Sequence, residues 1–199
     1  MLKSITSYFN HRQLKDSAYS FLFEDYNGDE VIVFDTETTG LNPKKDEILS
    51  IGAVLIKENV IVTSETFEIF LKPSNEISTE SIAIHHIRPC DLEDAQEPLK
   101  GIEAFLKFIG NRTLVGYYLE FDVAMINRYT KPWLGIVLPN KQVEVSALYF
   151  DKKIGLIPQG NIDLRFDTIL RELKVPNMGQ HNAVNDAIMT AMIYLKLKS

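Results

Sequence analysis

Three apolar runs with the character of buried β-strands lie close together in the first part of the chain and restrict its fold most narrowly. They cover residues 31–34, 48–56 and 61–71, and apolar and polar side chains alternate in the third run. β-Branched and aromatic residues favour strands, and consecutive strands joined by turns pair as an antiparallel meander. A β-sheet is therefore expected at the centre of the molecule.

Helical and strand-like patterns alternate in the rest of the chain. Apolar residues recur every three or four positions in segments 99–109, 121–129, 167–173 and 184–195, and short strand-like runs lie at residues 113–115 and 142–145. A meander followed by alternating helices and strands predicts an α/β fold, in which helices flank a five-stranded mixed sheet.

The beginning of the chain differs from the part that follows it. Apolar residues recur at roughly helical spacing from Leu14 to Leu22, and an acidic, turn-like stretch comes next. We expect a helical N-terminal extension over residues 1–29 and one folded domain over residues 30–199. A chain of 199 residues is long enough to bury a full hydrophobic core.

Composition limits the compartment in which the protein works. Apolar residues make up 45% of the chain, yet no apolar run approaches the ~20 residues of a membrane span. The N-terminus lacks the apolar segment of a secretory signal, and the single cysteine, Cys90, cannot form an internal disulfide. These observations predict a cytoplasmic protein without a membrane partner.

Charge is distributed unevenly along the chain. The net charge is −6, but residues 1–127 carry 11 basic and 21 acidic side chains, whereas residues 128–199 carry 10 basic and 6 acidic ones. An acidic protein can therefore still present a local surface that attracts phosphate groups. A solvated face without a partner explains the asymmetry equally well.

Two carboxylates directly follow the first strand-like run. Asp35 and Glu37 are two positions apart, and side chains at this spacing on a strand point to the same face. Two buried like charges repel each other, and a divalent cation between them removes the conflict. Carboxylate oxygens suit Mg²⁺ or Mn²⁺. The alternative, which this short pattern alone favours, is a pair of solvated acidic side chains at a strand end.

A histidine and a carboxylate stand at the start of the last helical segment. If Asn182 caps this helix, His181 lies in the loop before it and Asp186 lies about one turn into it, so both can face one site. A histidine beside a metal-bound carboxylate is suited to act as a general base. The alternative is an exposed loop histidine and an aspartate that interacts with the helix dipole.

A further carboxylate, Asp122, follows Phe121 where a helical segment begins. This helix comes directly after the short strand-like run 113–115, so its first turn lies close to the end of a strand. Asp122 is therefore a third candidate for the site. An aspartate that only caps the helix or occupies its first turn is the alternative.

Three motifs follow one another in a fixed order. They are D-T-E-T-T-G at residues 35–40, F-D at residues 121–122 and H-x-A-x-x-D at residues 181–186. With this order and spacing, residues 30–198 resemble the DEDDh family of 3′–5′ exonucleases, in particular the proofreading, epsilon-type domain of bacterial DNA polymerase III. The resemblance implies a ribonuclease-H-like fold, whose five-stranded mixed sheet agrees with the strand pattern described above.

The resemblance also implies a two-metal site and gives roles to the motif residues. Asp35, Glu37, Asp122 and Asp186 would bind two divalent cations, Mg²⁺ or Mn²⁺, and His181 would act as the general base. Two cations in such a site activate water and stabilise the leaving 3′ oxygen. The residues expected to hold the terminal nucleotide are Thr38, Thr39, Leu41, His85 and Phe121.

The chain departs from the family pattern at three places. Tyr117 and Tyr118 replace a His-Asn pair, His86 stands where many members have glycine, and Glu144 takes roughly the place of an aspartate. These departures bear on substrate preference, because a tyrosine can stack on a base. Packing in the core is the alternative for the tyrosines, and the end of a surface helix is the alternative for His85 and His86.

These observations predict a metal-dependent 3′–5′ exonuclease that releases nucleoside 5′-monophosphates from single-stranded DNA, in proofreading or repair. The alternatives are an RNA 3′ exonuclease of the same mechanism and a non-catalytic, polymerase-associated module that binds nucleic acid. The chain stops at Ser199, directly after the last helical segment and without the tail by which epsilon subunits bind their polymerase. We therefore expect a stand-alone or differently recruited exonuclease, with a nucleic-acid 3′ end as its partner and a DNA polymerase as a candidate partner.

Overall fold

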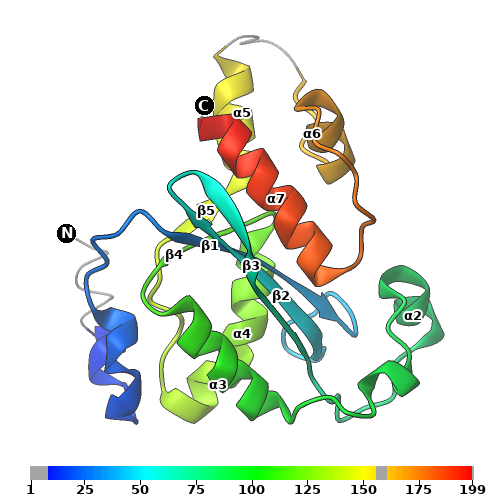
Figure 1. Ribbon diagram of the computed structural model, residues 1–199. Helices are drawn as coiled ribbons and strands as arrows, with labels where there is room; N and C mark the ends of the chain where they lie inside the picture. Colours follow the sequence, from blue (N-terminus) through cyan, green and yellow to red (C-terminus); the bar gives the residue numbers. More distant parts are fainter. Residues whose placement is uncertain (1–8, 156–160, 199) are drawn as a thin grey trace.

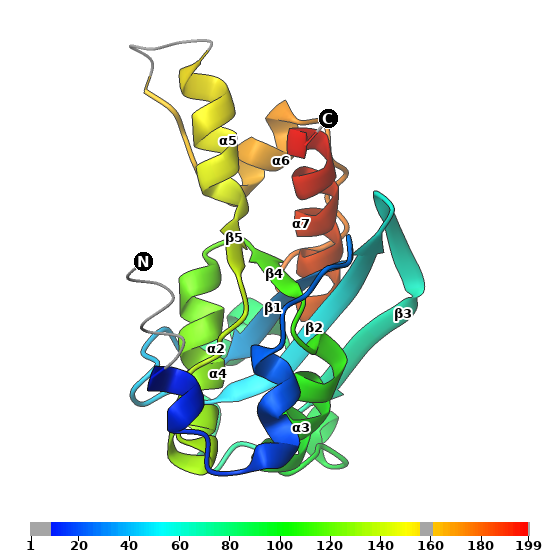
Figure 2. The same ribbon diagram turned by 90° about the vertical axis from the view of Figure 1, so that its left-hand side faces the viewer.

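The computed structural model describes residues 9–155 and 161–198, and a five-stranded sheet with helices on both faces forms its centre (Figures 1 and 2). The strands are β1 (Val31–Thr38), β2 (Ile48–Lys57), β3 (Val60–Phe70), β4 (Thr113–Gly116) and β5 (Gln142–Glu144). Their order in the sheet is β3-β2-β1-β4-β5. Neighbours among β3, β2 and β1 are antiparallel, whereas β1, β4 and β5 run parallel. The predicted mixed sheet is confirmed.

Besides a helical turn at residues 9–12, six α-helices and two 3₁₀ helices lie within the described residues. They are η1 (Ser17–Phe23), α2 (Thr79–His85), η2 (Pro89–Leu92), α3 (Pro98–Ile109), α4 (Leu119–Leu134), α5 (Val145–Ile154), α6 (Phe166–Glu172) and α7 (Ala183–Lys198). The sequence patterns located α3, α4, α6 and α7. They missed α2, which is only seven residues long, and α5, which buries only Val145 and Tyr149. Within the described ranges, no helix has the length and apolar character needed to cross a membrane.

Alternate residues of β1 belong to two hydrophobic cores on opposite faces of the sheet. Phe34 packs in the core that contains α3 and α4, whereas Val33 packs in the core that contains α5, α6 and α7. Figure 1 shows α7 along one face of the sheet, with α3 and α4 beyond the other. Because side chains alternate along a strand, Asp35 and Glu37 continue the face of Val33, and Thr36 continues the face of Phe34.

The N-terminal segment packs onto the sheet domain. Its described part contains a helical turn at residues 9–12 and the 3₁₀ helix η1, and Figure 2 shows the segment beside α3. Tyr19 and Leu22 of η1 are buried in the core formed with α3 and α4, and the ring of Tyr19 meets that of Trp133 edge-on at 5.2 Å between centroids. The first eight residues of the predicted extension lie outside the described residues.

Candidate active site

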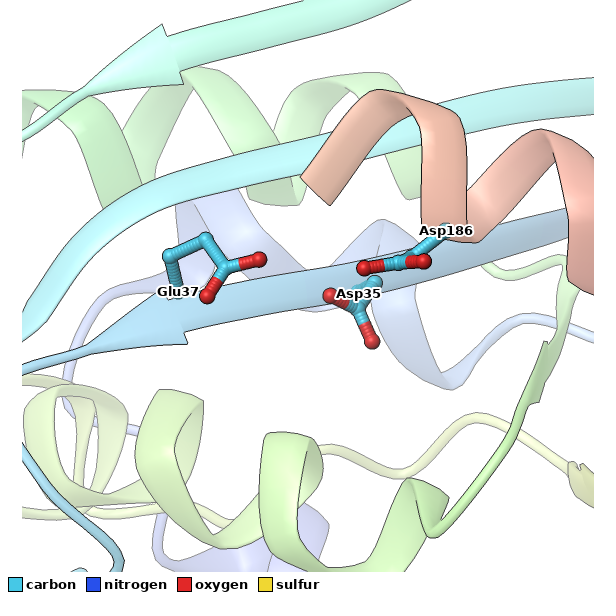
Figure 3. Close-up of side chains that lie close together, drawn as sticks. All are labelled: Asp35, Glu37 and Asp186. Carbon is cyan, nitrogen blue, oxygen red and sulfur yellow. The ribbon is translucent and has the colours of Figure 1, made fainter. Parts of the chain in front are cut away.

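Three carboxylates from two distant parts of the chain meet at the end of β1. Figure 3 shows Asp35 and Glu37 on β1 and Asp186 on the first turn of α7. One oxygen of each carboxylate lies within 4.8 Å of the other two. Oxygens grouped in this way form a suitable set of ligands for a hard divalent cation such as Mg²⁺ or Mn²⁺.

Gly52 on β2 allows α7 to bring Asp186 to the sheet. It pairs with Asp35 across the β1–β2 ladder, and a Cβ atom at this position would lie 2.2 Å from backbone atoms of Ala183 and Val184. Any larger side chain would push the first turn of α7 away from the sheet. The sequence analysis missed this residue, and the only available signal was a glycine inside a strand-like run, which often marks a close approach of another backbone.

Burial and mutual repulsion make the three carboxylates unfavourable without a counter-ion. Desolvation raises the pKa of Asp35 well above its usual value, and the charges of Asp122, Glu37 and Asp186 raise it further. Burial, with a contribution from Asp186, raises the pKa of Glu37 to about 7. Burial also raises the pKa of Asp186, whose buried Oδ1 has no hydrogen-bond partner among the described residues. A cation would compensate the charge and give this oxygen a partner, so the residues fit a metal ion.

His181 stands beside the carboxylates, in the loop before α7. Asn182 caps the helix as the sequence predicted, because its Oδ1 accepts a hydrogen bond from the N–H of Asn185 at 3.0 Å. The backbone of His181 is left-handed (φ 64°), and its N–H donates to Asp186 Oδ2 at 2.8 Å. His181 lines a cavity of about 170 Å³ together with Asp35 and Asp186, which we call the carboxylate cavity. A group bound in this cavity would contact both the histidine and the carboxylates.

Asp122 is held apart from the other three carboxylates. Its buried Oδ1 accepts hydrogen bonds from the N–H and the Oγ1–H of Thr36, at 3.0 and 2.6 Å. Burial raises the pKa of Asp122 to about 7, although the hydrogen bonds from Thr36 oppose this shift. Thr36 lies on the face of β1 opposite to Asp35 and Glu37, so Asp122 approaches the strand from the side of α4. In the part of the chain that the structure describes, the close group contains Asp35, Glu37 and Asp186 without Asp122.

The end of β1 and the loop that follows it contain three of the residues predicted to hold a nucleotide. Thr38 Oγ1 donates to the carbonyl oxygen of Gly40 at 2.8 Å, and Thr39 Oγ1 accepts a hydrogen bond from the N–H of Glu47 at 3.0 Å. Leu41 is 84% exposed. The two threonines therefore shape the loop, and the Leu41 side chain remains available for contact with a ligand.

His85 is buried, and both of its ring nitrogens make contacts within the protein. Its Nδ1 accepts a hydrogen bond from the N–H of Ile87 at 3.0 Å, so the neutral ring carries its proton on Nε2, which donates to Ser81 Oγ at 2.8 Å. Ser81 Oγ donates in turn to the carbonyl oxygen of Thr38 at 3.3 Å. Desolvation lowers the pKa of His85, which favours the neutral ring. The polar atoms of His85 thus connect α2 to the end of β1, and only its ring surface is left for a nucleotide.

Comparison with protein families agrees with this arrangement. A family model described as "Exonuclease" matches residues 32–194, which include the three close carboxylates and His181. The chain belongs to the exonuclease family.

Relatives of this exonuclease domain occur in bacterial replicative polymerases. It is 34% identical over 172 residues to DNA polymerase III PolC-type of Caldanaerobacter subterraneus, an alignment that covers 84% of the chain and 11% of that polymerase. It is 31% identical over 178 residues to DNA polymerase III subunit epsilon of Rickettsia typhi, with 83% of the chain and 72% of the subunit covered. The chain thus spans only a small part of the PolC-type relatives.

The fold matches that of E. coli exonuclease I in a complex with a dT13 oligonucleotide. The TM-score is 0.68 at 16% sequence identity, and the match covers 85% of the chain and 41% of exonuclease I. This likeness confirms the ribonuclease-H-like fold that the sequence resemblance implied.

Local structure accounts for the departures of this exonuclease from its family pattern. His86 is the C-cap of α2 in a left-handed conformation (φ 59°), where glycine has no steric cost. Glu144 caps α5 with its side chain, and its Oε2 accepts a hydrogen bond from the N–H of Leu119 at 2.8 Å. The Tyr117 hydroxyl donates to the carbonyl oxygen of Leu164 at 3.0 Å. The sequence analysis missed the capping role of Glu144 because it did not predict α5.

Burial of the carboxylates and the repulsion between them predict that the metal-free exonuclease loses stability as the pH rises. The pKa of Glu37 is about 7 in the folded chain, against an ordinary value of 4.5 for a glutamate. Between these values the folded protein retains a proton that the unfolded chain has released, so the free energy of unfolding falls through this window. We expect a decrease on the order of 2 kcal/mol between about pH 5 and pH 8, measured by urea unfolding with EDTA present.

Glu37→Gln is the matched control for this measurement. Glutamine keeps the size of the side chain and cannot ionise, so the variant should lose this part of the pH dependence. Saturating Mg²⁺ at the higher pH should restore the stability of the wild type. The same slope in the wild type and in Glu37→Gln would contradict the assigned repulsion.

Proposed function

We propose that the protein is a metal-dependent 3′–5′ exonuclease that releases nucleoside 5′-monophosphates from single-stranded DNA, in proofreading or repair. The observation that carries the proposal is the close group of Asp35, Glu37 and Asp186, of which Asp35 and Asp186 line the carboxylate cavity together with His181. Buried carboxylates that repel one another destabilise a fold unless a counter-charge is bound. Their arrangement in a chain of the exonuclease family supports a hydrolytic, metal-dependent reaction.

The acidic residues would hold two divalent cations, Mg²⁺ or Mn²⁺. Asp35, Glu37 and Asp186 offer oxygens that are already close together. Asp122 is the fourth proposed ligand, and its charge already acts on Asp35 from the side of α4. Bound cations in such sites supply positive charge that stabilises the phosphate oxygens and the leaving 3′ oxygen.

His181 would accept a proton from the water that attacks the terminal phosphodiester bond. A general base must lie within hydrogen-bond reach of this water. His181 is suited to this role because it lines the same cavity as Asp35 and Asp186. The hydrogen bond from its own N–H to Asp186 fixes the backbone from which the ring projects. The ring itself does not make this hydrogen bond, so proton transfer would not disturb it.

The single-stranded substrate is supported by the exposed groups around the site and by the relatives. Leu41 and Phe121 would contact the terminal nucleotide, with Thr38 and Thr39 holding the loop after β1 in place. The similar exonuclease I was crystallised with an oligonucleotide of deoxythymidine. The PolC-type and epsilon relatives support a DNA polymerase as a partner.

End-labelled oligonucleotides test this function directly. With Mg²⁺, a 5′-labelled single-stranded DNA should shorten one nucleotide at a time, and a 3′-labelled one should release its label in the first product. A 3′-phosphate should slow the reaction strongly, and a paired 3′ end should react more slowly than a single strand because the terminal base must first be unpaired. Release of the 5′ label as the first product would refute the proposed polarity, and faster cleavage of RNA than of DNA would favour an RNA exonuclease.

A further inference from the structure

A second hollow adjoins the carboxylate cavity at the turn between β4 and α4. The carboxylate cavity is lined by Tyr117 together with Asp35 and Asp186. The second hollow has a volume of about 260 Å³ and is lined by Tyr118, Leu119, Glu120, Gln142, Glu144 and Ser146. Tyr117 lines the carboxylate cavity and Tyr118 lines the second hollow. Because the two tyrosines are consecutive, the two hollows border the same turn of the chain.

Tyr118 is more exposed than packing would require. Its side chain is 67% exposed, and its backbone is left-handed, with φ 55° and ψ 33°. This conformation is unfavourable for a bulky residue, whereas asparagine or glycine adopts it readily. The ring is nearly parallel to that of Phe121, with 13° between the planes and 6.2 Å between the centroids. The exposed ring of Tyr118 therefore leaves a flat aromatic surface accessible to a ligand.

The carboxylates of Glu120 and Glu144 both line the second hollow, so it suits a neutral, flat ligand rather than a phosphate group. Both oxygens of Glu144 are occupied, since Oε2 accepts from the N–H of Leu119 at 2.8 Å and Oε1 accepts from Ser146 Oγ at 2.8 Å. The Gln142 side chain is exposed and carries both a donor and an acceptor. A nucleobase has a flat face that stacks on an aromatic ring and an edge that pairs with an amide.

We propose that the second hollow binds a base upstream of the nucleotide being removed, stacked on Tyr118 and in contact with Gln142. This assignment rests on the proposed function, because it places the 3′ end of the strand in the carboxylate cavity. In this assignment the strand passes from the carboxylate cavity over residues 117–118, whose side chains line the two hollows. The ligand of this subsite is thus an unpaired nucleobase within the same strand.

Two substrates of different length separate this subsite from the carboxylate cavity. The p-nitrophenyl ester of thymidine 5′-monophosphate contains one nucleotide and reaches only the carboxylate cavity, whereas a thymidine tetranucleotide reaches both. We expect Tyr118→Asn to lower the ratio of kcat/KM for the tetranucleotide to kcat/KM for the ester about tenfold, mainly through KM. Tyr118→Phe retains the stacking surface and should keep the wild-type ratio. Leu99→Asn, which changes an exposed apolar side chain on α3, is the matched control.

The outcomes distinguish the subsite from the proposed function. A ratio for Tyr118→Asn within about twofold of the wild type would overturn the subsite while leaving the nuclease intact. If the wild type hydrolyses neither substrate, the proposed function fails, and fluorescence anisotropy of a labelled tetranucleotide then decides on the subsite. Weaker binding by Tyr118→Asn but not by Tyr118→Phe or Leu99→Asn would support it, and equal binding by all would refute it. A melting temperature of Tyr118→Asn equal to or above that of the wild type is expected, since asparagine tolerates the left-handed backbone.

Discussion

Replacing Asp186 by asparagine is expected to abolish the nuclease activity of the purified protein in Mg²⁺ or Mn²⁺. The amide has nearly the same shape as the carboxylate, but it has no negative charge and is a weak ligand for a hard cation. The variant therefore retains only two of the three close carboxylates, Asp35 and Glu37. The measurement is the initial rate on a 5′-labelled single-stranded oligonucleotide, compared with the wild type in EDTA.

Stability measurements separate a lost ligand from a damaged fold. Asp186 repels Asp35 and Glu37, so Asp186→Asn should be at least as stable as the wild type at about pH 8 in EDTA. The increase in melting temperature that Mg²⁺ gives to the wild type should be smaller in the variant. Asp151→Asn, an exposed aspartate on α5, should keep full activity as the matched control. Wild-type activity in Asp186→Asn, or in the wild type with EDTA, would exclude the metal-dependent mechanism.

His181→Gln is expected to reduce the single-turnover rate by about 10²–10⁴ at saturating metal, the loss that follows removal of a general base. Glutamine cannot take up the proton of the attacking water. The hydrogen bond from residue 181 to Asp186 comes from the backbone N–H, so the variant should keep it and should still bind metal.

Two further variants control for backbone conformation and for histidines in general. His181→Asn suits the left-handed backbone at this position and should be as inactive as His181→Gln. His86 is also an exposed histidine with a left-handed backbone, and His86→Asn should stay within about threefold of the wild-type rate. A near-normal rate for His181→Gln would remove this residue from the proton transfer and leave it a structural part of the loop before α7.

The part of the site that lies on one strand could be predicted from the sequence. The spacing of Asp35 and Glu37 places both on the same face of β1, and Asn182 marks the start of α7 and thus the position of Asp186 one turn later. Local rules of strand alternation and helix capping are sufficient for these residues. The five strands followed from apolar runs for the same reason.

The parts that depend on how elements pack could not be predicted. Asp122 stays a proposed metal ligand, but its surroundings did not follow from spacing, because α4 packs on the face of Thr36 and the carboxylate accepts two hydrogen bonds there. Gly52 matters only because α7 crosses β2 directly above it. The hydrogen bonds that occupy both ring nitrogens of His85 depend on the short helix α2, which shows no periodic pattern. Sequence spacing contains no information about such contacts between distant segments.

The order in which the carboxylates leave the ribosome has a consequence for the cell. Asp35 and Glu37 are made early, whereas Asp186 and His181 come from the last helix and the loop before it. All five strands precede α7 in the chain, and the group of three carboxylates cannot exist until α7 has been translated. Nascent chains that are released before α7 is made would therefore lack the assembled site and could not degrade nucleic acid around them.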